Sequence, residues 1–222
     1  MNNLAQRTFI APLQLIISLG VLIFLSAWTI NFWQAWVYLF IFGLSFMLTL
    51  FYLYKNDQRL LQRRLNVIEK ENQQKKTQLY INVAYLAALF VSSLDHRFLW
   101  SDVPLSVVMI GDIFVILGYF IIFIALKDNA FAATTIEVFP DHKVVSSGLY
   151  AIIRHPMYLG AIIMLLGTPL ALGSWWGILT FIPIIFLIVR RLFEEEKILS
   201  HHLSGYKEYC QNVKCYLVPF IW

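Results

Sequence analysis

The feature that most constrains this chain is a long run of residues without a charge near its N-terminus. No Asp, Glu, Lys or Arg occurs from Thr8 to Tyr54. A helix needs about 20 apolar residues to cross the hydrocarbon core of a bilayer, so this run is long enough for two spans and too long for one. Asn31 and Gln34 lie near its middle among several tryptophans, as expected of a hairpin turn at the lipid headgroups. The run therefore predicts two consecutive membrane helices.

Three more apolar segments follow, at Leu79–Leu94, Leu105–Leu126 and Met157–Val189. As one helix the last would measure about 50 Å, more than a hydrocarbon core of about 30 Å. Small residues and a proline interrupt it, namely Gly167, Pro169, Gly173 and Ser174. It therefore predicts a hairpin of two helices, about 157–172 and 175–193. The expected fold is all-α, a polytopic integral membrane protein of about six hydrophobic helices followed by a cytoplasmic helical tail.

The distribution of basic residues predicts which side of the membrane each loop occupies. Lys55–Gln78 carries seven basic residues against three acidic ones, whereas the opposite turns hold only Arg97. By the positive-inside rule this loop is cytoplasmic, and both termini, residues 127–156 and the tail after residue 190 then lie on the same side. We interpret the loop as a topology signal and headgroup contact. Its basic residues are Lys55, Arg59, Arg63, Arg64, Lys70, Lys75 and Lys76.

The chain has no detectable repeat or flexible linker, which indicates one structural domain with two parts. Residues 1–128 supply membrane helices and the basic loop 55–78. In residues 129–222 polar groups gather at predicted helix ends, and a short helix is expected at Tyr206–Val213 after Gly205. Cys210 and Cys215 are expected in the cytoplasm, where a disulfide is not favoured, and no metal-binding spacing is present.

The first polar cluster is Arg154-His155-Pro156-Met157-Tyr158. Pro156 suits the first turn of a helix, which puts His155 at the N-cap, where free N–H groups favour an anion. Arg154 adds positive charge at the same place. The alternative is an interfacial anchor, with the arginine reaching the headgroups and Tyr158 in the aromatic belt.

Two further groups of polar residues are candidates for ligand binding. Arg191 and Glu195 are four residues apart and share a helical face, within a stretch that contains three consecutive carboxylates at 194–196. These carboxylates suit a cationic sulfonium, an amine or a ribose diol, although an ion pair on a solvated face is also consistent. The segment from Asp141 to Tyr150 is a polar loop in which Gly148 permits close approach of a ligand to the backbone.

Charged residues also occur near the membrane surface that faces away from the cytoplasm, and their role is less clear from the sequence. Asp112 lies inside the predicted span 105–126, and intramembrane carboxylates are candidates for function, although a structural or wet site fits equally well. Residues 95–97, Asp-His-Arg, fall at an outer turn and are expected to be solvated.

Taken in order, these clusters resemble the isoprenylcysteine carboxyl methyltransferase family and the related phospholipid N-methyltransferases. The resemblance covers about residues 129–222, and the earlier part is similar only in being membrane spans. The residues that carry it are His142, Val144, Val145, Gly148, Tyr150, Arg154, His155, Pro156, Tyr158, Arg191, Glu195, Glu196, Leu199, Gly205, Tyr206 and Tyr209.

The resemblance implies an S-adenosylmethionine-dependent methyltransferase without a metal. Arg191 and Arg154 are its candidate catalytic residues, and Arg191 would orient a carboxylate of the acceptor. The expected cofactor-binding residues are His142, Lys143, Val144, Val145, Gly148, Tyr150, His155, Pro156, Tyr158, Glu195 and Glu196.

The reaction implied is in-line methyl transfer from the sulfonium to a lipophilic or lipidated acceptor that enters from the bilayer. A carboxylate acceptor needs no general base, so positioning and desolvation suffice. An amine acceptor, as in a phospholipid N-methyltransferase, would need Glu196 or Tyr158 to take a proton. An NADPH-dependent sterol-type reductase and a non-enzymatic membrane protein remain as alternatives. Besides membrane lipids, no partner such as nucleic acid is expected.

Overall fold

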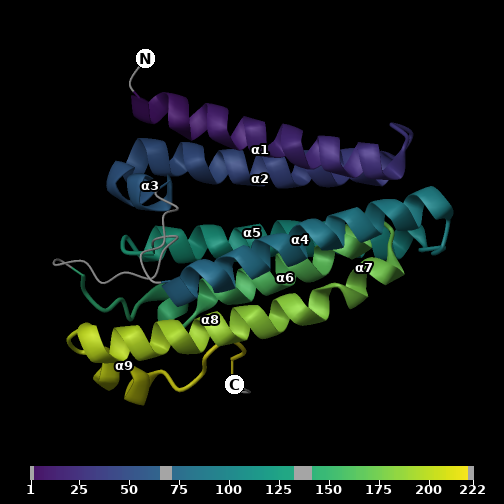
Figure 1. The fold of residues 1–222 in the computed structure, drawn as a ribbon. Helices are drawn as coiled ribbons and strands as arrows, with labels where there is room; N and C mark the ends of the chain where they lie inside the picture. The colour runs from purple at the N-terminus through teal and green to yellow at the C-terminus, as the bar shows by residue number, and fades with distance from the viewer. Residues whose placement is uncertain (1–2, 66–71, 133–141, 220–222) are drawn as a thin grey trace.

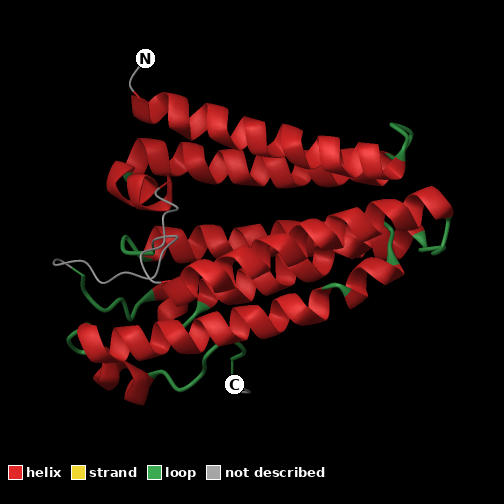
Figure 2. Cartoon of the chain, viewed as in Figure 1, coloured by secondary structure: helices red, strands yellow, loops and turns green. Residues whose placement is uncertain are grey.

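The computed structural model describes residues 3–65, 72–132 and 142–219. Within these ranges the chain is helical, without a strand (Figures 1 and 2). Lys70 of the basic loop, Asp141 and residues 220–222 lie outside the described residues. The elements are α1 (Asn3–Ala27), α2 (Trp33–Asn56), α3 (Gln58–Leu65), α4 (Asn72–Phe98), α5 (Leu105–Asp128), η1 (Gly148–Ala151), α6 (Pro156–Ala171), α7 (Trp175–Leu179), α8 (Phe181–His202) and α9 (Tyr206–Asn212).

Five stretches of helix are long and apolar enough to cross a membrane, and α6 is a shorter apolar helix. This confirms the all-α, polytopic membrane fold with about six hydrophobic helices. The long helices run roughly along one direction, and α3, the C-terminal end of α8 and α9 gather at one end of the bundle (Figure 1). The five long spans are Thr8–Ala27, Trp33–Asn56, Gln74–Phe98, Leu105–Asp128 and Trp175–His202.

The predicted break in the last apolar stretch is present, and a second break follows it. The turn after α6 passes through Gly173, which has a φ of 67°. The side chain of Ser174 then caps α7 by accepting a hydrogen bond from the backbone N–H of Gly177 at 2.8 Å. Pro183 has no N–H to donate to the carbonyl four residues earlier, which explains why α7 ends and α8 begins near Thr180. From there α8 continues to His202.

Helices α5 and α6 pack with their backbones in contact through two pairs of glycines. A Cβ atom on Gly118 would lie 2.5 Å from the carbonyl oxygen of Gly160, and one on Gly160 would lie 2.7 Å from that of Gly118. Seven residues further along, a Cβ on Gly167 would lie 2.6 Å from the carbonyl oxygen of Gly111. Small residues permit such close approach between membrane helices, where packing rather than hydrophobic burial holds helices together.

Replacing Gly118 by Ala is therefore expected to destabilise the folded protein by about 1–3 kcal/mol, because α5 and α6 must separate to admit one methyl group. The thermal midpoint of the purified protein in detergent would measure this loss. Gly20→Ala is the matched control, since its Cβ would lie 3.4 Å from a Leu39 side-chain carbon and α1 would gain helix propensity. Equal midpoints for the two variants would contradict the close packing of α5 on α6.

The expectation that residues 95–97 are solvated is wrong for Asp95. Its side chain is buried and accepts hydrogen bonds from the backbone N–H of Ser101 at 2.8 Å, the Ser101 hydroxyl at 2.7 Å and the Ser174 hydroxyl at 2.5 Å. The Asp95 carboxylate can be buried because it accepts hydrogen bonds from two turns, one at Ser101 and the other at Ser174. His96 is half-buried and Arg97 is exposed.

Candidate active site

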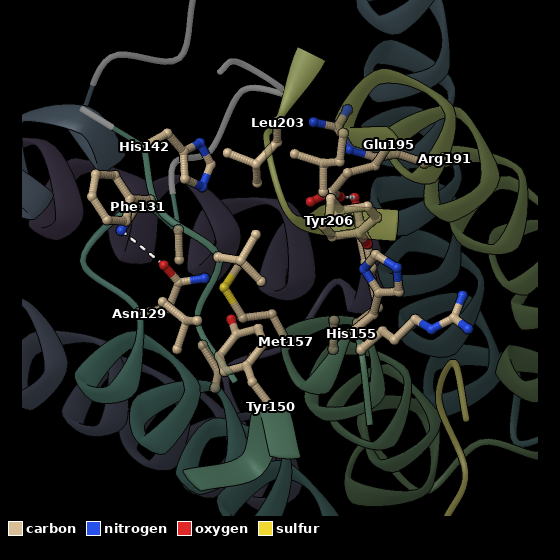
Figure 3. Close-up of a pocket in the computed structure, with 18 of the residues that line it drawn as sticks. Asn129, Phe131, His142, Tyr150, His155, Met157, Arg191, Glu195, Leu203 and Tyr206 are labelled. Atoms are coloured by element: carbon tan, nitrogen blue, oxygen red, sulfur yellow. Dashed lines mark hydrogen bonds between the residues drawn. The ribbon is translucent and has the colours of Figure 1, made fainter. Parts of the chain in front are cut away.

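A cavity of about 340 Å³ lies where the polar segments gather (Figure 3). Such a volume falls within the usual range of small-molecule sites. Its walls come from α3, α4, α5, η1, α6, α8 and α9, and from residues 129–132 and 142–145, so both parts of the chain contribute. One region of the lining is apolar and comes from the membrane helices. It consists of Ile81, Ile122, Ala161, Leu165 and Ile188.

The turn that leads into α6 has the predicted geometry. Pro156 occupies the first helical position and His155 is the N-cap residue. The His155 side chain makes no capping hydrogen bond and is directed elsewhere. The backbone N–H groups of Arg154 and His155 donate to the carbonyl oxygens of Cys215 and Tyr216, each at 3.0 Å. The C-terminal tail is therefore paired to this turn and holds it beside the cavity.

Glu196 joins the turn to α8 and α9. Its Oε1 atom lies 2.8 Å from Nε2 of His155 and accepts a hydrogen bond from the Tyr206 hydroxyl at 2.7 Å. Its Oε2 atom accepts one from Arg154 at 3.0 Å. Burial and this hydrogen bond raise the pKa of Tyr206, so the phenol remains a donor. Glu196 does not line the cavity, and its oxygens bind protein donors.

Arg154 uses its guanidinium to hold the tail. Nε donates to the carbonyl oxygen of Val213 at 2.6 Å, and Nη2 donates to that of Cys210 at 2.8 Å. The group lies 4.5 Å from the centre of the Tyr216 ring. Burial acts to lower the pKa of Arg154, but Glu196, Cys210 and Tyr216 together outweigh it and the pKa is raised. Although Arg154 borders the cavity, its charge is directed to the tail rather than to a ligand.

Glu195 faces the cavity, one residue before Glu196. Its Oε2 atom accepts a hydrogen bond from the Tyr158 hydroxyl at 2.6 Å. From the part of the chain that the structure describes, Oε1 accepts none. Arg191 is 5% exposed, lies one turn earlier on α8 and interacts electrostatically with the same phenol. Figure 3 shows Glu195, Arg191, His155 and Tyr206 together on one side of the cavity. A carboxylate with an available oxygen can accept hydrogen bonds from a ligand.

The opposite side is formed by the segment before η1. His142, Lys143, Val144 and Val145 line the cavity, and the His142 ring stacks on Phe131 with centroids 4.6 Å apart. Figure 3 shows this pair across from Glu195, with Asn129 and Tyr150 below it. Burial raises the pKa of Tyr150, so its phenol is protonated at neutral pH.

Gly148 serves the backbone turn and not the cavity. Its φ is 58°, a left-handed conformation that glycine adopts without strain. A Cβ atom there would overlap the carboxylate of Asp128, which also accepts a hydrogen bond from the backbone N–H of Leu149 at 3.3 Å. The close approach that Gly148 permits is therefore made by Asp128, and this differs from the ligand approach expected from the sequence.

Most of the residues singled out in the sequence are brought together at this cavity. Gly148, Pro156 and Glu196 do not line it, and neither does Asp112. Those that do line it are His142, Lys143, Val144, Val145, Tyr150, Arg154, His155, Tyr158, Arg191 and Glu195.

Sequence reasoning missed Arg64, which also lines the cavity although it belongs to the basic loop. A signal was present in the sequence. Leu60 and Leu61 precede Arg64 by four and three residues, so the three share one face of a helix. The two leucines are buried, which turns this face of α3 inward.

Several comparisons with known proteins give related results. A family model described as phospholipid methyltransferase matches residues 106–205. The protein-S-isoprenylcysteine O-methyltransferase of Schizosaccharomyces pombe is 36% identical over 75 residues, which are 33% of this chain and 32% of that protein. The Delta(14)-sterol reductase TM7SF2 of Mus musculus is 28% identical over 93 residues, which are 40% of this chain and 22% of that protein.

A solved structure of the eukaryotic intramembrane Ras methyltransferase ICMT (isoprenylcysteine carboxyl methyltransferase) is also similar. It has a TM-score of 0.48 and 21% sequence identity, with 93% of this chain and 74% of that chain covered.

The family model and the Schizosaccharomyces pombe relative confirm the resemblance that the motifs indicated. The chain spans 32% and 22% of the lengths of the two curated relatives. The family match includes α5, η1, α6, α7 and α8, which supply Tyr158, Arg191 and Glu195 to the cavity. Residues 106–205 of this chain are thus similar to the phospholipid methyltransferases, and a stretch of 75 residues is similar to a protein-S-isoprenylcysteine O-methyltransferase.

Proposed function

We propose that this protein is an S-adenosylmethionine-dependent methyltransferase that acts on a lipophilic acceptor, with a carboxylate of isoprenylcysteine type as the methylated group. The proposal rests on one observation: Glu195 and Arg191 line the same cavity as a group of apolar residues from the membrane helices. A cationic cofactor needs the charged environment and an apolar acceptor needs the apolar one, and methyl transfer requires the two to be adjacent. The family match over residues 106–205 supports methyl transfer as the reaction.

The cofactor fits the polar side of the cavity. The Oε1 atom of Glu195, which accepts no hydrogen bond from the described residues, would accept one from a ribose hydroxyl or the ammonium group. His142 through Val145, Tyr150, His155 and Tyr158 would line the rest of this site. When bound, S-adenosylmethionine supplies an electrophilic methyl group on its sulfonium. Glu196 and Arg154 would act indirectly, by holding the 154–155 turn in place.

The acceptor would lie on the apolar side. Its hydrocarbon chain would contact Ile81, Leu165 and Ile188, which line the cavity from α4, α6 and α8. Arg191 would pair with its carboxylate and aim an oxygen at the methyl group. Because a carboxylate is a nucleophile at neutral pH, the protein needs to position it and exclude water, and no general base is required. We place this end of the bundle in the cytoplasm, because the positive-inside rule predicts a cytoplasmic position for the basic loop.

A second candidate, an N-methyltransferase acting on a phospholipid amine, is favoured by the description of the matching family. An amine acceptor must lose a proton, and Tyr158 with Glu195 would be the groups at hand. The similarity to a sterol reductase makes NADPH the alternative cofactor to exclude.

Binding measurements on the purified protein in detergent test the function. We expect saturable binding of S-adenosylhomocysteine by calorimetry and none of NADPH. Binding of NADPH alone would assign the protein to the reductases, and binding of neither would contradict both enzymatic functions.

The acceptor would then be tested with S-adenosylmethionine labelled in its methyl group. Incorporation into N-acetyl-S-farnesylcysteine that is released as methanol by base would indicate a carboxyl methyl ester. Base-stable incorporation into phosphatidylethanolamine would indicate N-methylation instead.

A further inference from the structure

Arg64 reaches the cavity because α3 is fixed against the bundle. The side chain of Asp57 accepts a hydrogen bond from the backbone N–H of Leu60 at 2.9 Å at the start of the helix. Leu60 and Leu61 are fully buried in a cluster that includes Leu126 of α5. Arg64 follows these leucines by one helical turn, so its side chain is directed to the same interior face.

The surroundings of Arg64 are those of a binding group rather than a headgroup anchor. It lines the cavity together with Tyr150 and Tyr158. Its guanidinium interacts electrostatically with the phenols of these two residues and of Tyr119 on α5. Burial acts to lower the pKa of Arg64, but an arginine remains charged throughout the physiological range. The cavity therefore contains a permanent cation that comes from outside the family match at 106–205.

We infer that Arg64 binds a carboxylate of a ligand held in this cavity. A guanidinium presents a planar pair of donors that matches a carboxylate in geometry and charge. The inference rests on the proposed function, in which two carboxylates enter the cavity. One belongs to the amino-acid part of S-adenosylmethionine and the other to the acceptor. Arg64 would bind one of these, so that the N-terminal part of the chain helps to recognise the ligands.

Arg63 provides a matched control one residue away. Its guanidinium donates to the carbonyl oxygen of Ala130 at 3.0 Å and lies 5.1 Å from the centre of the Phe131 ring. It is not among the residues that line the cavity. Arg63→Gln and Arg64→Gln thus remove the same charge from the same helix, but only the second removes it from the cavity.

The experiment compares ligands that differ only in their carboxylate. Calorimetry would give affinities for S-adenosylhomocysteine and its decarboxylated analogue, and for N-acetyl-S-farnesylcysteine and its carboxamide. Wild type, Arg64→Gln, Arg64→Lys and Arg63→Gln would be measured, each checked by its thermal midpoint. We expect Arg64→Gln to weaken one carboxylate ligand at least about tenfold, because a hydrogen bond to a charged group is lost. The matching ligand without a carboxylate should bind the variant as it binds wild type, and Arg64→Lys should recover part of the affinity.

The ligand pair that responds identifies the carboxylate. A loss confined to S-adenosylhomocysteine assigns Arg64 to the cofactor, and a loss confined to the farnesylated acid assigns it to the acceptor. Equal effects on ligands with and without a carboxylate, or no difference between Arg64→Gln and Arg63→Gln, would overturn the inference while wild-type binding upheld the methyltransferase. Wild-type protein that bound neither ligand would overturn the proposed function and this inference together.

Discussion

Replacement of Glu195 by Gln is expected to weaken the binding of S-adenosylhomocysteine by about 10- to 100-fold, because hydrogen bonds to a charged acceptor are lost. The side chain keeps its shape, and the amide oxygen can still accept the hydrogen bond that the Tyr158 hydroxyl donates at 2.6 Å. The fold should therefore be unaffected. Calorimetry would measure the affinity, and an unchanged thermal midpoint would show that the loss arises in the cavity.

Tyr158→Phe is the control for this result. It removes the donor to Glu195 and leaves the carboxylate in the cavity. Its effect on affinity should be smaller than that of Glu195→Gln. The Glu195 carboxylate keeps its charge in this variant and loses only the hydroxyl group that orients it. Wild-type affinity in Glu195→Gln would show that this carboxylate does not bind the cofactor, even if the protein proved to be a methyltransferase.

Replacement of Glu196 by Gln is expected to have its main effect on stability. Arg154 and His155 would lose the carboxylate that joins them to α8, and the Arg154 and Glu196 side chains are only 9% and 14% exposed. Removing one partner of a buried ion pair is destabilising by about 3–5 kcal/mol. The tail should loosen first, because the same turn pairs with the backbone of Cys215 and Tyr216.

Limited proteolysis would detect this loosening. Lys214 is exposed and lies directly before the paired residues of the tail. Trypsin should cut after Lys214 faster in Glu196→Gln than in wild type, and the thermal midpoint should fall. Glu195→Gln should be cut at the wild-type rate, so each glutamate variant serves as the control for the other. Wild-type cleavage and an unchanged midpoint in Glu196→Gln would show that other contacts hold the tail.

Local sequence determined the helical elements of this protein and the side of the bundle to which its polar segments belong. Long runs without charge specify membrane helices, because a charged group is unfavourable in the hydrocarbon core. Pro156 at the start of α6 and Gly205 before α9 mark helix ends through their own backbone preferences. The motifs also identified most of the residues that line the cavity.

The tertiary structure decided which of these residues face a ligand. Glu195 and Glu196 are neighbours in sequence but point about 100° apart around α8, and only the packing of α8 against the 154–155 turn and α9 distinguishes them. Arg154 is directed to the tail by a hydrogen bond to Val213, 59 residues later in the sequence. Arg64 lines a cavity whose other walls come mainly from the C-terminal part of the chain. Hydrophobic periodicity and helix-end signals are properties of a local segment, so they can be found in the sequence. The hydrogen-bond partner of a polar side chain depends on which distant segments folding brings next to it.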